Sequence, residues 1–325
     1  MKAPTISDVR DAAKRIDNHV TRTPLRLSHH LSEIAGREVR LKMETMQDTG
    51  AFKLRGATNA LLNLPEDLRV RGVVTMSSGN HGRGLAFASK KLGIPCTVYM
   101  SELVPSVKVE AIRALGADVV IAGPSQETAE VAVLEHVECD GVTYVHAFDQ
   151  PDIIAGQGTL GLEILEDMPD TASVLIPLSG GGLFAGVAMA MKSLNPNIHT
   201  VGITMENGPA MIDSLKAGHP VPVNEVKSLA DALGGTIGLQ NELSFDMTKR
   251  YIDETALVSE DEIAGAMRTL FLKDQVVAEG GGAVGVAALL SGRLDLPDGP
   301  VAIIISGCNV EMTKFMEIVS APPKA

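Results

Sequence analysis

The sequence has no tryptophan, and its seven phenylalanines and three tyrosines amount to 3% of 325 residues. Single-stranded nucleic acids are bound largely by stacking bases on aromatic side chains, so this shortage argues against such a partner. Positive charge is also short, because 28 Lys and Arg residues stand against 40 Asp and Glu, a net charge of −12. This charge repels phosphate backbones and anionic lipids. We therefore expect no nucleic-acid partner and no membrane partner.

Cysteine is scarce as well, because Cys96, Cys139 and Cys308 lie far apart and form no Cys-x-x-Cys pair. This spacing indicates neither a disulfide framework nor a structural zinc site. The N-terminal segment is charged where a signal peptide would be apolar. One uncharged run, 173–191, has membrane-spanning length, but Pro177 and three glycines interrupt it, which predicts a strand, a turn and a buried helix. We expect a reduced, cytoplasmic protein.

Short β-branched runs alternate with helical stretches along most of the chain. The strand-like runs are 72–76, 95–100, 117–122, 173–178, 199–204 and 301–306, and the helical stretches are 83–92, 107–115, 126–137 and 183–193. This alternation is typical of parallel α/β sheets with helices on both faces. In 39–44, apolar residues alternate with Arg40, Lys42 and Glu44, which predicts a half-exposed strand. We expect the chain's end, 322–325, to be frayed.

Glycine, in contrast, is abundant, with 32 residues and no collagen-like period. The segment Ser179-Gly180-Gly181-Gly182-Leu183 lies between a predicted strand and a predicted helix. A helix N-terminus has free amides and a positive dipole, and glycine lets a phosphate approach them closely. The segment therefore indicates a phosphate site more strongly than a tight turn.

Three segments fit the dinucleotide spacing Gly-x-Gly-x-x-Gly/Ala: 156–161, 180–185 and 280–285. A nicotinamide site also needs an acidic residue at the end of the next strand. After 180–185 the first such acid, Glu206, comes several residues late, and 156–161 lies in a predicted helix. A nicotinamide oxidoreductase is therefore the weaker alternative. For Gly280–Gly282, turn geometry is the only explanation that the sequence offers.

Three other segments carry polar groups at predicted strand ends or helix starts. Ser77–Gly84 brings hydroxyls, an amide side chain and free backbone amides to a strand-to-helix junction, which suits a carboxylate or a phosphate. Lys53 lies where a loop enters a helix, although a lysine by itself is usually a solvated surface residue. Ser306–Asn309 ends a buried strand, where open α/β sheets bind their ligands.

In this order, these segments resemble the pyridoxal-phosphate enzymes of fold type II, the tryptophan-synthase-β type. Within them, the chain is similar to the family of threonine/serine dehydratases and serine racemases. The matching segments are 42–44, 50–57, 77–84, 154–161, 177–183, 279–285 and 306–310. The resemblance implies a two-domain, parallel-sheet α/β/α fold. Residues 46–150 would form a small domain, residues 1–45 plus 151–325 a large one, and the protein would be a homodimer.

The resemblance also implies roles around the cofactor. Lys53 would form the Schiff base with pyridoxal 5'-phosphate, with Phe52 beside the ring and Asn80 hydrogen-bonded to the ring hydroxyl. The backbone amides of Ser179–Leu183 would hold the phosphate. Ser306 would face the pyridine nitrogen. Because a neutral hydroxyl does not keep this nitrogen protonated, the electron sink is weaker, and loss of a β-substituent competes well with a long-lived carbanion.

On the substrate side, Ser77, Asn80 and His81 lie in the segment that binds the carboxylate in this family. The implied reaction is β-elimination of water from a β-hydroxy amino acid, which gives a keto acid and ammonia. The amine of Lys53 would remove the α-proton, which requires a neutral amine of the kind that desolvation favours. Ser78 corresponds to the second proton donor of the racemases, so amino-acid racemisation is an alternative. A catalytically silent binding module is another.

Some segments resemble a narrower group, the dehydratase of hydroxyectoine utilisation. They are 80–84, 177–180 and 228–235. L-threonine, L-serine, hydroxyaspartate and a hydroxyectoine-derived amino acid all carry the required hydroxyl, and the sequence does not rank them. The chain leaves no room after the last motif for the regulatory domain of biosynthetic threonine dehydratases, so we expect no feedback through such a domain.

The sequence departs from the family pattern at a few positions. Ala51 replaces the usual serine before Phe52 and Lys53, and Cys308 replaces a glycine. Glu206 and Ala210 match ligands of the divalent-cation site found in many members. The aspartate that would complete this site is replaced by Ile212, with Asp213 one place later. Whether a cation binds is therefore left open.

Overall fold

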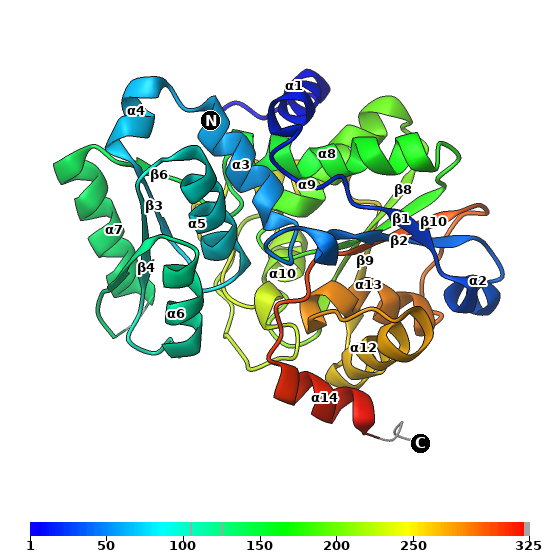
Figure 1. Cartoon of the computed structure of the whole chain (residues 1–325). Helices are drawn as coiled ribbons and strands as arrows, with labels where there is room; N and C mark the ends of the chain where they lie inside the picture. Colours follow the sequence, from blue (N-terminus) through cyan, green and yellow to red (C-terminus); the bar gives the residue numbers. More distant parts are fainter. Residues whose placement is uncertain (105, 125, 322–325) are drawn as a thin grey trace.

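Two β-sheets organise the chain, which we describe from a computed structural model covering residues 1–104, 106–124 and 126–321 (Figure 1). The predicted frayed tail, 322–325, lies outside the described residues. The strands are β1 (Leu25–Leu27), β2 (Val39–Met43), β3 (Val73–Met76), β4 (Cys96–Met100), β5 (Asp118–Ile121), β6 (Thr143–Tyr144), β7 (Ser173–Pro177), β8 (His199–Met205), β9 (Glu254–Val258) and β10 (Val301–Ile305).

The helices alternate with these strands, as predicted. They are α1 (Ile6–Ile16), α2 (His29–Ala35), α3 (Lys53–Asn63), α4 (Glu66–Arg71), α5 (Asn80–Leu92), α6 (Ser106–Ala114), α7 (Gln126–Asp140), α8 (Pro151–Asp167), α9 (Gly182–Leu194), α10 (Ala210–Ala217), α11 (Leu243–Tyr251), α12 (Glu260–Asp274), α13 (Gly280–Leu290) and α14 (Met312–Ser320), with 3-10 turns η1 (Glu44–Met46) and η2 (Asp231–Leu233). No helix in the described part of the chain is long and apolar enough to cross a membrane.

The larger sheet has the strand order β1-β2-β10-β7-β8-β9 and is parallel except for β1, which pairs antiparallel with β2. Alternate residues of a strand point to opposite faces, so its central strands feed two cores. Val174 and Ile176 pack against α8 and α9, whereas Leu175 and Ile303 pack against α12 and α13. Helices therefore cover both faces, which confirms the predicted α/β/α arrangement.

The smaller sheet has the order β5-β4-β3-β6 and is parallel throughout (left in Figure 1). Its strands pack against α3, α5 and α6 through one core, which includes Val73 and Val98, and against α7 through another, which includes Val74 and Tyr99. The two sheets confirm a two-domain fold. Our proposed domain limits, 45/46 and 150/151, fall between β2 and α3 and at the start of α8.

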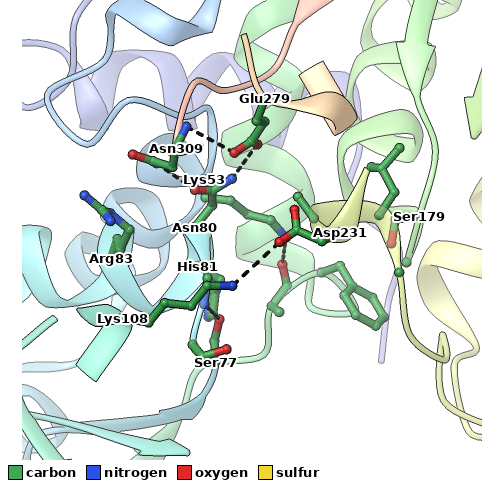
Figure 2. A pocket seen from close by; sticks show the side chains of 18 of the residues that line it. Lys53, Ser77, Asn80, His81, Arg83, Lys108, Ser179, Asp231, Glu279 and Asn309 are labelled. Carbon is green, nitrogen blue, oxygen red and sulfur yellow. Dashed lines mark hydrogen bonds and ion pairs between the residues drawn. The ribbon is translucent and has the colours of Figure 1, made fainter. Parts of the chain in front are cut away.

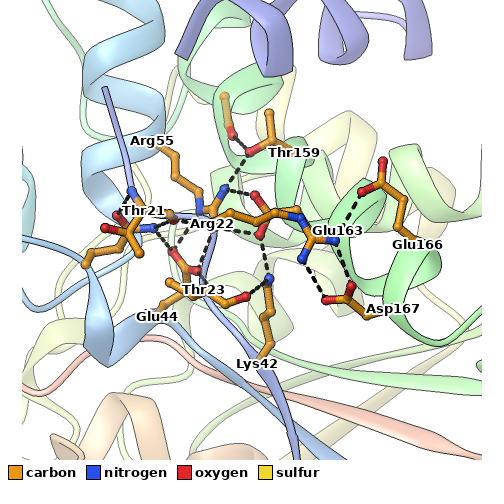
Figure 3. Close-up of polar contacts among 12 residues, drawn as sticks. Thr21, Arg22, Thr23, Lys42, Glu44, Arg55, Thr159, Glu163, Glu166 and Asp167 are labelled. Atoms are coloured by element: carbon orange, nitrogen blue, oxygen red, sulfur yellow. Dashed lines mark hydrogen bonds and ion pairs between the residues drawn. The ribbon is translucent and has the colours of Figure 1, made fainter. Parts of the chain in front are cut away.

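The prediction of a half-exposed strand at 39–44 is wrong. β2 lies inside the larger sheet, and the side chains of Lys42 and Glu44 are fully buried. Their charges are neutralised by partners that the local pattern does not show: Lys42 Nζ lies 2.5 Å from a carboxylate oxygen of Glu163, and Glu44 is paired with Arg55 at 2.8 Å. Lys42 and Glu44 thus belong, with Arg55 and Glu163, to a buried ionic network (Figure 3) and not to a solvated face of the strand.

Candidate active site

A cavity of about 640 Å³ lies between the two sheets, at the carboxyl ends of β3, β4, β7 and β10. Parallel strands present their carboxyl ends at one edge of a sheet, which is why polar segments from distant parts of the sequence meet there. The residues predicted for the cofactor and substrate all line this cavity: Phe52, Lys53, Ser77, Ser78, Asn80, His81, Ser179, Gly180, Gly181, Gly182, Leu183 and Ser306.

Lys53 is the first residue of α3, and its Nζ donates a hydrogen bond to the carbonyl oxygen of Ala147 at 2.7 Å. Burial lowers the pKa of this amine to about 8, because the charged form is poorly solvated there. The backbone before it is fixed to the end of β10: Phe52 N–H donates to Ser306 O at 3.0 Å, and Cys308 N–H donates to Gly50 O at 2.9 Å. Lys53 and Ser306 are thus held against one another by main-chain bonds.

The glycine-rich segment before α9 gives the cavity a set of free amides. Gly181 has φ +92°, a left-handed conformation that favours glycine, and α9 begins at Gly182. The first amides of a helix have no partner within the helix and can bind an anion. The glycines are also required by packing, since a Cβ at Gly180 would lie 2.5 Å from the ring of Phe148.

Side chains outside the cavity also hold the 179–183 segment in place. Ser244 Oγ donates to the carbonyl oxygen of Gly180 at 2.7 Å, while Ser244 N–H donates to the Asp149 carboxylate at 2.6 Å. Asp149 belongs to the connection between β6 and α8, whose Ala147 carbonyl contacts Lys53. One connecting segment therefore contacts both the lysine and the residues that hold the glycines in place.

The N-terminus of α5 forms another wall of the cavity, where Gly79 is the N-cap and Asn80 the first helical residue. His81 is buried, and burial together with Lys53 lowers its pKa to about 3. Its Nε2 lies 3.0 Å from the carbonyl oxygen of Val145, which can only accept, so this nitrogen donates. The lowered pKa keeps the ring neutral near pH 7. His81 thus brings no positive charge to this wall, where Ser77, Ser78, Asn80, Arg83 and the first amides of α5 are hydrogen-bond donors.

Two residues to which the sequence analysis assigned no role complete this wall. Glu279 is the N-cap of α13, and its carboxylate accepts from Asn80 Nδ2 at 2.7 Å (Figure 2). Asn309 follows β10 and donates from Nδ2 to Asn80 Oδ1, also at 2.7 Å. A carboxylate directly before a glycine run, and an amide just past a buried strand, were the signals available.

The glycine run 280–282, unexplained by sequence, serves close packing. A Cβ at Gly280 would overlap the backbone carbonyl of Leu229, and one at Gly282 would lie 2.7 Å from Gly307 O. The start of α13 can therefore lie directly against the end of β10 and the 229–230 segment. This contact brings Glu279 to the cavity.

The candidate cation site is not assembled in this structure. Glu206 has an exposed side chain, and Asp213 pairs with Lys216 at 3.5 Å. Among the residues that the structure describes, no group of three or more His, Cys, Asp or Glu side chains could hold a metal ion. Ala210, at the start of α10, contributes no side-chain ligand, and neither Glu206 nor Ala210 lines the cavity.

The groups lining the cavity fit pyridoxal phosphate. An amine with a lowered pKa can react with an aldehyde, free amides at the N-terminus of α9 suit a phosphate, and the buried hydroxyl residue Ser306 suits a ring nitrogen. The cavity volume is within the range of small-molecule sites. Lys53, Phe52, Asn80, residues 179–183 and Ser306 are the residues that would hold this cofactor.

Comparison with known proteins also indicates a pyridoxal-phosphate enzyme. The family model described as "Pyridoxal-phosphate dependent enzyme" matches residues 16–307. The chain is 44% identical to an L-threonine ammonia-lyase of Thermotoga maritima, over 97% of this chain and 78% of the relative. Among solved structures it is similar to maize serine racemase (TM-score 0.92, 31% identity, 97% of each chain) and to threonine deaminase isoform 2 from Solanum lycopersicum (TM-score 0.90, 33% identity, 98% of this chain and 89% of that one).

Proposed function

Because the chain belongs to the family of pyridoxal-phosphate-dependent enzymes, with threonine ammonia-lyases among its relatives, we propose that it converts L-threonine to a keto acid and ammonia. It is a pyridoxal-phosphate-dependent lyase of the dehydratase type. The observation that supports the proposal most is that Lys53, the amides before α9 and Ser306 line one cavity. L-serine, hydroxyaspartate and a hydroxyectoine-derived amino acid are the other substrates of this class.

We assign the cofactor ligands from their positions. Lys53 would bond the cofactor's aldehyde carbon, residues 179–183 would bind its phosphate, Asn80 its ring hydroxyl and Ser306 its ring nitrogen. The ring of Phe52 lies 5.4 Å from Lys53 Nζ, which supports a place beside the cofactor ring. Ser77 and the first amides of α5 would bind the substrate carboxylate.

When bound, pyridoxal phosphate withdraws electrons from the α-carbon of the attached amino acid, so that the α-proton becomes acidic and the β-substituent can leave. The part of Lys53 is to take the α-proton at Nζ. Because its pKa is about 8, about a tenth of the amine is neutral at pH 7, far more than for a solvated lysine. The β-hydroxyl leaves as water. One water is then consumed when the amino nitrogen of the substrate is released by hydrolysis as ammonia, so the net products are a keto acid and ammonia.

We further propose that the protein works in the cytoplasm and as a homodimer. A reducing compartment is supported by the cysteines, because Cys96, Cys139 and Cys308 form no disulfide. The dimer is expected from the family alone. Size-exclusion chromatography with light scattering would test it, and a monomeric mass would contradict it.

The site assignment can be tested by reduction and mass spectrometry. Borohydride treatment of the cofactor-loaded protein should fix the cofactor mass on the peptide that contains Lys53. Lys53→Ala should lose both this adduct and the visible absorbance band, while Lys108→Ala, which removes another lysine at the cavity, should keep both. An adduct on another lysine in the wild type would overturn the assignment.

Racemisation is a second candidate activity, because Ser78 lines the same cavity as Lys53 and serine racemases from maize and Dictyostelium discoideum are similar in structure. In this case Ser78 would return a proton to the α-carbon from the face opposite Lys53. Ser78→Ala should then abolish formation of D-serine from L-serine and leave some keto-acid formation. If wild-type protein forms keto acid and no D-isomer, racemisation is excluded.

A further inference from the structure

Asn80, Glu279 and Asn309 form a hydrogen-bonded network on one wall of the cavity (Figure 2). The three residues come from the start of α5, the N-cap of α13 and the segment after β10. Glu279 is only 5% exposed, and each of its oxygens accepts one hydrogen bond: Oε1 from Asn80 Nδ2 at 2.7 Å, and Oε2 from the backbone N–H of Asn309 at 3.1 Å. Burial raises the pKa of Glu279 to about 7, against the two hydrogen bonds that favour its ionised form, so above this pH the group is mainly a carboxylate that accepts from both donors.

Two backbone groups set the direction of every bond in this network. The Asn309 side chain donates from Nδ2 to the carbonyl oxygen of Thr49 at 2.8 Å, and a carbonyl can only accept. The second proton on Asn309 Nδ2 is donated to Asn80 Oδ1 at 2.7 Å. At the other end, the Asn309 backbone N–H can only donate, and it faces Glu279. The amide of Asn80 therefore has one allowed orientation, with its oxygen on Asn309 and its nitrogen on Glu279.

We propose that Glu279 and Asn309 are positioning residues that make Asn80 a hydrogen-bond donor toward the cofactor ring. Nδ2 of Asn80 carries two protons, and Glu279 accepts one of them. The other has no acceptor among the residues that the structure describes, and Asn80 lines the cavity. The inference rests on the proposed function, in which the ring hydroxyl lies beside Asn80.

The consequence for the cofactor is electrostatic. A donor N–H stabilises the ionised form of a ring hydroxyl, whereas an acceptor oxygen would stabilise the protonated form. If Asn80 were free to rotate, its amide could present either group. The network removes this choice, so that Asn80 would favour the ionised form of the ring oxygen.

The chain leaves space for the carboxylate of Glu279 beside Gly307. A Cβ at Gly307 would lie 2.5 Å from Glu279 Oε1, so the glycine after Ser306 leaves space for it. Glu279→Gln keeps the size but replaces one oxygen by an NH₂ group. That group would face either Asn80 Nδ2 or the Asn309 N–H, and in both cases a donor would meet a donor. The substitution therefore breaks one hydrogen bond of the network in either orientation and removes the carboxylate charge, with little change in volume.

The test is a pH titration of the visible absorbance of the cofactor-loaded protein. Glu279→Gln should raise the apparent pKa of the cofactor chromophore, with its ionisation constant lowered about tenfold, because a hydrogen bond to a charged group is lost. Glu311→Gln is the matched control, since its exposed carboxylate lines the same cavity outside the network, and it should titrate like the wild type.

A purely structural role for Glu279 makes a different prediction. Glu279→Gln would then unfold at a lower temperature or bind the cofactor more weakly, while the bound chromophore titrates as in the wild type, and this result would overturn the proposal. If Glu279→Gln does not fold, the titration of Asn309→Ala decides, because it frees Asn80 Oδ1 and should shift the chromophore in the same direction. If wild-type protein mixed with pyridoxal phosphate shows no visible absorbance band, the proposed function itself is refuted.

Discussion

At the scale of the residue, Lys53 is defined by its surroundings more than by its type. The sequence places it between two glycines before a helix, where a lysine is ordinarily solvated, and only the ordered set of motifs distinguishes it. The structure supplies the missing physical reason: burial lowers the pKa of its amine to about 8, and its partner is a neutral carbonyl, that of Ala147. Long-range burial of this kind is not visible in a local pattern.

The lowered pKa of Lys53 predicts how cofactor attachment depends on pH. The neutral amine attacks the aldehyde, so the rate of attachment to cofactor-free protein should rise with pH and level off above about 8, where the amine has lost its proton. Stopped-flow absorbance with pyridoxal phosphate measures this rate. A solvated lysine would level off only above about 10, so a profile that still rises steeply there would contradict the buried state of Lys53.

At the scale of the element, the sequence located most strands and helices because each local pattern agrees with the fold. The run 301–306 became β10, buried throughout, and 183–193 became α9. β2 was misjudged because its charged residues are neutralised from elsewhere: Glu163 lies on α8, more than a hundred positions away, and Arg55 lies on α3. The Glu279 network escaped sequence reasoning for a similar reason, since its members meet only in the folded chain.

The buried ionic network holds α3, which begins with Lys53, against α8 and β2 (Figure 3). The guanidinium of Arg55 is fully buried and lies 2.8 Å from Glu44 and 2.6 Å from Glu163. Burial alone would lower the pKa of Arg55 and raise that of Glu44. The pairing of opposite charges outweighs burial, so that the pKa of Arg55 is raised and that of Glu44 is lowered. Removal of one charge leaves its partners buried and unpaired, which is the costly case.

We therefore expect Arg55→Met to lower the free energy of unfolding by about 3–5 kcal/mol. Arg22→Met is the matched control, because Arg22 is half-exposed and pairs with Glu166 and Asp167 at the surface, so its loss should cost less than about 1 kcal/mol. Urea unfolding of the two variants measures both values. Equal losses would show that the network does not contribute through its burial.

Helices α3 and α8 also cross at glycines. A Cβ on Gly156 would lie 2.7 Å from the Cα of Gly56 and 2.8 Å from the backbone oxygen of Arg55, so neither neighbour could move aside by a side-chain rotation. Gly156→Ala should destabilise the protein by about 1–3 kcal/mol through this overlap.

A second glycine-to-alanine change provides the control. Gly265 lies within α12, and a Cβ added there would meet no heavy atom within 4 Å, so Gly265→Ala should stabilise the protein by up to about 1 kcal/mol through helix propensity. Thermal unfolding should therefore shift in opposite directions for the two variants. A stabilising Gly156→Ala would mean that the two helices do not cross closely.

At the scale of the whole molecule, the cavity draws its groups from both sheets. Lys53 and Asn80 belong to α3 and α5, which pack on the smaller sheet, whereas the glycines before α9 and Ser306 follow strands of the larger one. Lys108 of α6 and Asp231 of η2 form an ion pair across the cavity at 3.7 Å (Figure 2). A bound cofactor would therefore connect the two halves.

This arrangement predicts that pyridoxal phosphate raises the unfolding temperature of the cofactor-free protein, since a ligand that binds the folded state stabilises it. Pyridoxal, which has the same aldehyde but no phosphate, should give a clearly smaller shift at the same concentration, because the free amides at the start of α9 then bind nothing. Differential scanning fluorimetry compares the two. Equal shifts would contradict a phosphate site at residues 179–183.

The most direct test of the central claim is the formation of product from L-threonine by the cofactor-loaded protein. We predict that 2-oxobutanoate and ammonia appear in equal amounts, and that Lys53→Ala abolishes both while Lys108→Ala does not. The account would be contradicted if the wild type releases no keto acid from any β-hydroxy amino acid tested, or if Lys53→Ala is as active as the wild type.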